Sequence, residues 1–333
     1  MPDKSKLIPL LAALRAYADE HKIAGKSGYH LEKSRWHADH PGSTGADHMA
    51  EMRRSYQDQQ GLGRTPLTEV KKLDPAYSAK VGAAYDRMPE WDARALPAYQ
   101  ALIDEVQAQH DHLVKAGYKY TLHYDPHEPY SDSHAMRQDL HDNGHMHVYA
   151  TASGFGGDPF EHHYKLENGV NVPIVPRPNP LLQHVPGLST PERPVVANDL
   201  FRFVHDAFGH GIHPHQFGPL GEDNAYREHM TMFTPLAQQA LTTETRGQNS
   251  WVNFGPHMQR KDGTFPKKGD PDFVPAPDRP FADQKIALLP DFATSLDAHD
   301  TKVKSYAADD TTDPHDWDEP RHQPKVNWGK GGK

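Results

Sequence analysis

The stretch from Asn198 to Gly255 constrains the fold more than any other part of this 333-residue chain. Its first part, NDLFRFVHDAFGH, places apolar residues on more than one side of a predicted helix, with Asn198 and Asp199 at the N-cap. A helix that is apolar on several sides is buried in a core. We therefore expect a helical core around this segment, with two histidines, His205 and His210, inside it.

Apolar residues that recur three and four positions apart predict further helices. The clearest pattern runs from about residue 92 to 116, and Asp74 followed by Pro75 predicts another helix start. Strand-like alternation is confined to residues 118–124 and 145–151. These patterns predict an α+β fold, a mainly helical single domain with a small sheet and long Pro/Gly-rich loops.

Polar composition at both ends of the chain predicts a structured centre. We expect a helix at 1–23, a polar loop segment at 24–66, a metal-binding catalytic-type domain at 67–296 and a mobile charged tail at 297–333. Within the domain, Gly and Pro in residues 154–194 predict a non-helical crossing or lid, and the apolar residues of 281–292 predict a helix that closes the core.

Composition excludes several classes of chemistry and of partner. The chain has no cysteine, so disulfides, zinc-cysteine sites, iron-sulfur clusters and a thiol nucleophile are excluded. A net charge of -9 argues against nucleic acid as a partner. No apolar run reaches the roughly 18 residues of a membrane span, and the start of the chain lacks a secretory signal pattern. We expect a cytoplasmic protein.

His205 and His210 are the first two residues of a candidate metal site. Five positions on a regular α-helix separate two side chains by about 140° around the axis, which is unfavourable for sharing one ion. Gly209 and Gly211 allow the helix to end or distort there, so the convergence of the two imidazoles depends on these glycines. A bound metal ion is one way of satisfying two buried imidazole rings.

Glu244 is the carboxylate that we assign to the same site. A helix starting at Pro235 carries Glu244 on an apolar side, where a carboxylate needs a metal ion or Arg246 as a partner. Two imidazoles and one carboxylate on one face of an octahedral ion suit ferrous iron that activates dioxygen. Zinc prefers four ligands including a water, so the ligand set alone does not decide the metal.

The segment His205–His210, HDAFGH, resembles the H-E-x-x-G-H element of the pterin-dependent aromatic amino acid hydroxylases. TTETRG, with Glu244, resembles the segment that holds the third ligand of that family. The resemblance implies that His205, His210 and Glu244 bind Fe(II). It also implies a tetrahydropterin cofactor, with Asp206 standing where the family has a glutamate lining the pterin pocket. Separately, RGQNSWVNFGP and FADQKIALLP resemble segments of uncharacterised bacterial and phage proteins, and that resemblance implies no activity.

Other residues are candidates for substrate and cofactor contacts. The candidates for the family's substrate-binding arginine are Arg193, Arg202 and Arg246, and Phe155 is the candidate for its pterin-stacking aromatic residue. Gln248 is a further cofactor-binding candidate. Arg246 and Asn249, in RGQNSW beside Glu244, offer hydrogen bonds to a substrate or to the ligands. The alternative for that segment is a turn after a helix.

These residues predict a mononuclear non-heme iron(II) oxygenase, hydroxylase-like, acting with dioxygen on a small-molecule or amino-acid-like substrate. Three alternatives stay open. His-Asp dipeptides at 110–111, 141–142 and 205–206 permit a metal-dependent hydrolase of the HD-phosphohydrolase type. A non-enzymatic phage or structural protein with a stabilising metal site is the second. In the third, the two histidines only pack a buried helix while Glu244 pairs with Arg246.

Further histidines and carboxylates are substitutes or secondary candidates. If Glu244 or His210 is not a ligand, the substitutes are Glu222, Glu228, His213 and His215. His145 and His147 share one face of a predicted strand and form a second cluster, with no carboxylate obviously placed to join it. His110 lies on an apolar helix stripe and is expected to be a core histidine.

Overall fold

The structure is a computed structural model, and it describes part of the chain. The described residues are 45–63, 70–125, 129–154, 164–167, 170–173, 179–190, 194–213 and 215–296. The helix predicted at 1–23 and the tail predicted at 297–333 lie outside them, as do Phe155 and Arg193.

Helices make up most of the described chain. The α-helices are α3 (Gly45–Gln60), α4 (Pro75–Arg87), α5 (Leu96–Lys115), α6 (Ser133–Asn143), α7 (Thr151–Gly154), α8 (Ala197–His205), α9 (Pro219–Met230), α10 (Pro235–Thr242) and α11 (Gln248–Phe254). Two π-helical segments, η3 (Asp206–His210) and η4 (Thr243–Gly247), continue α8 and α10. Short 3-10 turns are η1 (Ala93–Ala95), η2 (Pro180–Leu182), η5 (Pro256–Met258), η6 (Ala276–Asp278) and η7 (Asp291–Thr294).

The described strands form three two-stranded sheets. β1 (Lys119–His123) and β2 (His145–Tyr149) pair in parallel, with Lys119 opposite His145. The antiparallel pairs are β3 (Tyr164–Glu167) with β4 (Val170–Pro173), and β5 (His184–Ser189) with β6 (Pro194–Val196). The fold is therefore mainly helical α+β with a small sheet, which confirms the predicted class.

The helices begin and end where local chemistry directs them. The Asp74 carboxylate accepts hydrogen bonds from the amides of Ala76 and Tyr77, and Pro75 occupies the first helical position of α4. The apolar stripe predicted between residues 92 and 116 forms the buried face of α5. Gly117, with φ of 98°, follows this helix in a conformation that favours glycine.

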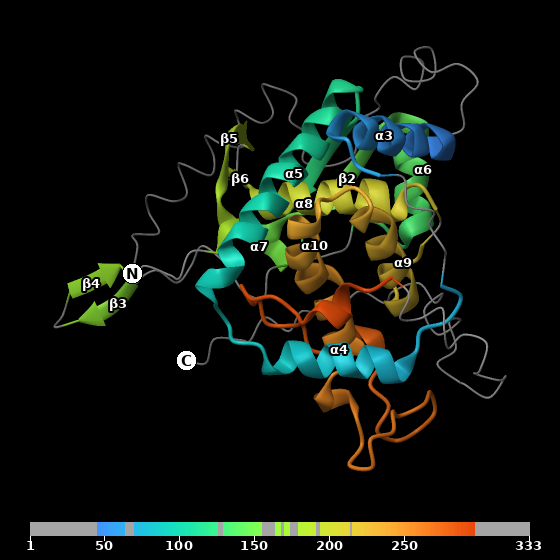
Figure 1. Cartoon of the computed structure of the whole chain (residues 1–333), viewed down its shortest axis with the longest axis vertical. Coiled ribbons are helices and arrows are strands. Elements are labelled where there is room, and N and C mark those ends of the chain that lie inside the picture. The colour runs from blue at the N-terminus through green and yellow to red at the C-terminus, as the bar shows by residue number, and fades with distance from the viewer. Residues whose placement is uncertain are drawn as a thin grey trace.

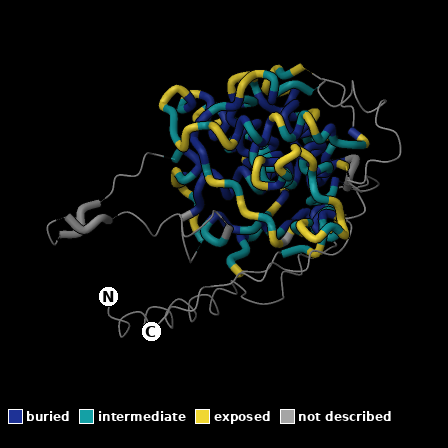
Figure 2. Tube along the Cα trace, turned by 90° about the horizontal axis from the view of Figure 1, so that it is seen from below, coloured by how far each residue is buried: buried dark blue, intermediate teal, exposed yellow. Residues whose placement is uncertain are grey.

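α8 is the central element of the core. All its residues except Arg202 are buried, and it contacts α5, β2 and α9. Figure 1 shows α8 in the middle of the helical body, with α3 and α4 at opposite ends. Figure 2 shows buried segments running through the interior of this body. The helix starts at Ala197 rather than at an Asn198 cap, because the Asp199 carboxylate accepts from the Val196 amide at 3.0 Å.

Two predicted segments have a different structure. The segment 24–66, predicted as a polar loop, contains α3, because Met49 and Tyr56 lie seven positions apart and bury one helix side. Residues 281–292, predicted as a helix, are irregular up to η7. The backbone of Ile286 instead pairs with the chain beside Trp91, donating to Glu90 O at 2.8 Å. None of the described helices is long and apolar enough to cross a bilayer.

Candidate metal centre

The π-helical segment η3 brings His205 and His210 together. Their ring centroids are 5.5 Å apart, with the rings nearly perpendicular at 83°. A π-helix forms hydrogen bonds between residues i and i+5, so side chains five positions apart share one face. This removes the roughly 140° separation that a regular α-helix would impose. The predicted convergence of the two imidazoles is therefore present, through a helical distortion at the expected place.

Gly209 and Gly211 act through close packing. A Cβ atom on Gly209 would lie 3.0 Å from the Cβ of Ala225 and 3.1 Å from its carbonyl oxygen, so α9 approaches η3 over this glycine. A Cβ on Gly211 would lie 2.2 Å from the carbonyl oxygen of Ala207. A side chain at either position would therefore clash with these atoms.

The carboxylate beside the two histidines belongs to Glu222, on the first turn of α9. Its Oε2 lies 3.4 Å from Nε2 of His210 and 3.8 Å from Nε2 of His205. The three side chains form a group whose ligand atoms all lie within 4.8 Å of one another. His210 is fully buried, whereas the Glu222 side chain is 31% exposed. The group is therefore partly exposed on the Glu222 side.

The Nδ1 atom of His210 is held by the backbone. It lies 2.8 Å from the carbonyl oxygen of His215, which only accepts hydrogen bonds, so Nδ1 carries the proton and donates it. The Nε2 atom then faces Oε2 of Glu222, with room for a proton or a metal cation between them. This is how the second nitrogen of a metal-binding histidine is usually fixed.

The Nδ1 atom of His205 is held by a buried chain of side chains. It lies 3.2 Å from Nδ1 of His229, whose Nε2 lies 2.7 Å from Oε1 of Gln109. The Gln109 amide nitrogen donates to Met232 O, which orients the amide, so Oε1 accepts the Nε2 proton of His229.

The hydrogen bonds of His229 then determine which ring nitrogen of His205 donates to it. Burial, followed by the nearby His205 and His210, holds the pKa of His229 well below its usual value. A neutral ring that donates through Nε2 accepts through Nδ1. His205 therefore donates from Nδ1, and its Nε2 faces Glu222. Both histidines present Nε2 to the same carboxylate.

Electrostatics at this group favour a positive charge between the side chains. Burial by itself raises the pKa of Glu222, but His210 and His205 hold that pKa well below its usual range. Burial lowers the pKa of His210, and the charge and hydrogen bond of Glu222 outweigh it and raise this pKa to about 8. An anionic carboxylate facing two imidazole nitrogens is suited to a proton or to a metal cation.

Asp206 is the one side chain near this group with an unused carboxylate among the residues described. Burial raises the pKa of Asp206. The nearby His210 and His205 partly offset this rise, and the charge of Glu222 adds to it. The Asp206 carboxylate forms no hydrogen bond with another described residue, whereas its backbone amide donates to Arg202 O and Phe203 O. A buried carboxyl group with a raised pKa beside candidate ligands is a candidate for proton transfer.

The prediction that Glu244 completes the ligand set does not match the structure. Its Oε1 accepts from the Tyr99 hydroxyl at 2.5 Å, and its Oε2 accepts from the Gln248 amide at 2.8 Å. Segment η4 follows α10, which packs against α5, and this packing directs Glu244 to Tyr99 rather than to His205. Burial raises the pKa of Glu244 to about 7.

Arg246 and Asn249 support the backbone instead of facing the histidines. The fully buried Arg246 pairs with Asp223 at 2.7 Å and also donates to Ala293 O. Asn249 donates to Pro219 O at 2.9 Å. Together with Gln248, which bonds Glu244, these residues tie α9 and α11 to the core, so their predicted substrate and cofactor contacts do not agree with this placement.

Of the four substitute residues, Glu222 lies with His205 and His210, and the other three form a separate group. Glu228 is buried and contacts His213 at 2.8 Å and His215 at 3.4 Å. Arg53 also contacts Glu228, at 2.5 Å, and already supplies a positive charge. This group is therefore a cluster of ion pairs around Glu228. It holds the loop that contains His215, whose carbonyl oxygen accepts a hydrogen bond from His210.

The His-Asp dipeptides do not share one metal group in the described structure. His110 is a buried core residue, as predicted, with Nδ1 2.9 Å from Asp111 and its ring against Phe203. His141 donates from Nε2 to Gly211 O at 3.0 Å. Only the third dipeptide, His205 with Asp206, lies in the candidate centre.

Two residues of the centre were missed from the sequence, although a signal for each exists. His229 follows Glu222 by seven positions on a helix that begins at Pro219, so the two share a helix side. Gln109 lies on the apolar stripe of α5 and is fully buried, where an amide needs partners. Polar residues on otherwise buried stripes mark this site.

Comparison with known proteins identifies no relative. No protein-family model matches the chain, and neither does any curated protein or solved structure. The function proposed below therefore depends on the geometry of the chain itself.

Proposed function

We propose that the chain is a mononuclear non-heme iron(II) oxygenase, hydroxylase-like, with His205, His210 and Glu222 as its metal ligands. The observation that carries the proposal is the convergence of two imidazole Nε2 atoms on one partly exposed carboxylate. Two neutral imidazoles and a carboxylate leave three positions of an octahedral ion for substrates, which is the set typical of such oxygenases.

The spacing of the three side chains fits one ion. Ligand atoms about 2.1 Å from a metal and at right angles are about 3.0 Å apart. The two observed spacings from Oε2 of Glu222, 3.4 Å and 3.8 Å, need only small side-chain rotations to reach that value. The fixed Nδ1 atoms keep both lone pairs aimed at the ion during such a rotation.

Ferrous iron bound here would supply the electrons and the coordination positions for dioxygen activation. The chain's own residues bind and orient: Gln109 and His229 keep Nε2 of His205 directed inward, and the buried Asp206 carboxyl group would hold or release a proton beside the ligands. Insertion of one oxygen atom also requires two electrons from a reduced co-substrate. Phe155 and Arg193 lie outside the described residues and Gln248 bonds Glu244, so no tetrahydropterin is included in the proposal.

A small-molecule or amino-acid-like substrate and dioxygen are the partners in this proposal. The oxygenase proposal also includes a cytoplasmic location, because a reducing compartment keeps iron ferrous.

Two matched variants test the ligand set. Glu222→Gln removes the carboxylate charge beside the histidines, and Glu244→Gln makes the same change beside Tyr99. In an anaerobic ferrous titration, the wild type and Glu244→Gln should bind about one iron per chain. Glu222→Gln should lose more iron affinity than the roughly 10- to 100-fold typical when a residue that only orients a ligand is changed. Unchanged iron affinity in Glu222→Gln would overturn the assignment.

A metal-dependent hydrolase is the second candidate, favoured by Asp206 and by one spacing. Tetrahedral ligands about 2.1 Å from zinc are about 3.4 Å apart, which equals the distance from His210 to Glu222. Asp206 would then take a proton from the attacking water. Elemental analysis of the purified protein separates the two candidates, and iron with substrate-dependent oxygen uptake supports the oxygenase. Zinc with phosphoester cleavage supports the hydrolase.

A further inference from the structure

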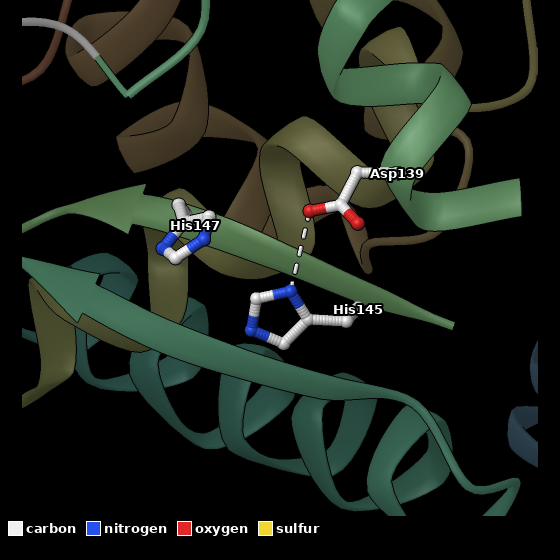
Figure 3. Close-up of side chains that lie close together, drawn as sticks. All are labelled: Asp139, His145 and His147. Carbon is white, nitrogen blue, oxygen red and sulfur yellow. Dashed lines mark hydrogen bonds and ion pairs between the residues drawn. The ribbon is translucent and has the colours of Figure 1, made fainter. Parts of the chain in front are cut away.

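A second group of metal-binding side chains lies where α6 leads into β2. Figure 3 shows Asp139 on α6 and the two histidines of β2, His145 and His147, directed toward one another. Gly144, with φ of 59°, makes the turn between helix and strand. One atom from each of the three side chains lies within 4.8 Å of the others. The carboxylate that the sequence alone did not supply for this cluster is therefore Asp139.

The Asp139 carboxylate is held in a fixed orientation. Its Oδ2 accepts from the Tyr130 hydroxyl at 2.6 Å, and its Oδ1 accepts from the Asn143 amide at 2.6 Å. The Tyr130 oxygen itself accepts from the backbone amide of His147 at 2.7 Å. Carboxylates that bind metal ions are usually held by outer hydrogen bonds of this kind.

The two imidazoles are placed by the parallel strand pair. His145 is buried, with Nε2 2.9 Å from the Thr121 hydroxyl of β1 and Nδ1 3.2 Å from Oδ2 of Asp139. His147, two positions along the strand, points to the same side, and the ring centroids are 4.8 Å apart. His147 is half-buried, so the group is reachable from solvent.

We propose that Asp139, His145 and His147 bind a divalent transition-metal ion of the zinc type. Tetrahedral ligands about 2.0–2.1 Å from zinc are about 3.3 Å apart, and Nδ1 of His145 lies 3.2 Å from Oδ2 of Asp139. Two nitrogens and one oxygen favour zinc, cobalt or nickel over calcium or magnesium. Water occupies the fourth position on the exposed side of His147.

The second ion would brace the first site. It joins β2 to α6, and α6 holds the loop after η3: Arg137 donates to Gly211 O at 3.1 Å, and His141 donates to the same oxygen. The binding proposal itself does not depend on the oxygenase proposal, because no side chain is shared by the two groups.

Cobalt(II) titration of the metal-stripped full-length chain tests the proposal. The wild type should bind two ions tightly, and tetrahedral cobalt at the second site should give a visible absorption band. His147→Ala should lose that band and one ion, with a fall in affinity at this site of more than about 100-fold. His210→Ala should lose the other ion and keep the band. Asp139→Asn, which preserves the shape of the side chain, should behave as His147→Ala.

His184→Ala is the control, because His184 is an exposed histidine of β5 outside all three groups. It should keep both ions, and far-ultraviolet circular dichroism should show every variant folded. Two tightly bound ions with wild-type affinity in both His147→Ala and Asp139→Asn would overturn the proposal. So would a wild type that binds a single ion lost in His210→Ala. A single ion lost only in His147→Ala would support this site and contradict the first one.

Discussion

The Nδ1 atom of His205 lies 3.2 Å from the Nδ1 atom of His229, and this contact sets which nitrogen of His205 faces Glu222. His229 in turn bonds Gln109, so a buried amide on α5 reaches the candidate ligand on α8 through one imidazole. Three elements far apart in the sequence thus meet at a single ring. Removing any one of these three side chains leaves a buried hydrogen-bond donor or acceptor without its partner.

His229→Phe keeps a buried ring of similar size and removes the acceptor for His205. His205 is then able to rotate or to change its tautomer, so the affinity for ferrous iron should fall roughly 10- to 100-fold. Gln109→Leu should cause a smaller loss of the same sign, since His229 stays in place. Isothermal titration under anaerobic conditions measures both. Wild-type affinity in a folded His229→Phe protein would show that the contact does not position the ligand.

Gly209→Ala should weaken metal binding without touching a ligand. The added methyl group would lie 3.0 Å from the Cβ of Ala225, so α9 must move away and carry Glu222 with it. We expect a loss of stability of about 1–3 kcal/mol and a clear fall in iron affinity. Ala225→Gly in the same chain removes the nearest contact and should restore part of the affinity. If the double variant binds iron no better than Gly209→Ala, close packing is not the cause.

Sequence periodicity predicted the elements whose signals are local. α4 begins at its Asp-Pro start, and α5 follows its apolar stripe. The histidines of β2 share one face because strand side chains alternate. The pairing of His205 with His210 was also predictable, because both lie on one buried segment. These features depend on residues within a few positions of each other.

The identity of the carboxylate was not predictable in the same way. Glu222 and Glu244 both lie on helices next to apolar residues, and only the packing of α9 over Gly209 decides which one reaches the histidines. The π-helical form of η3 has no sequence pattern that distinguishes it from an α-helix. The extended backbone around Ile286 likewise depends on a distant partner, the chain beside Trp91.

Glu244 should make stability depend on pH. Burial raises its folded-state pKa to about 7, above the value of about 4.3 expected in the unfolded chain. The folded state holds the proton more tightly, so this contribution is complete below the unfolded pKa and is lost as pH rises to about 7. The total is on the order of 4 kcal/mol.

Glu244→Gln tests this directly, because it mimics the protonated carboxyl. Tyr99 then donates to Lys285 O, 2.8 Å away, and accepts from the new amide. In urea unfolding the variant should match the wild type near pH 5 and exceed it near pH 8. Equal differences at both pH values would mean that Glu244 does not titrate in this range.

Arg246 should prove structural. Its guanidinium is fully buried, pairs with Asp223 on α9 and lies over the Tyr226 ring at 4.3 Å. Arg246→Leu leaves Asp223 buried without this partner, which should cost about 3–5 kcal/mol of stability. Adding Asp223→Leu to this variant removes the buried carboxylate charge and should recover part of the lost stability. Thermal unfolding measures the stability, and iron titration of the folded fraction should give wild-type affinity. A variant of normal stability that fails to turn over substrate would instead assign Arg246 to the chemistry.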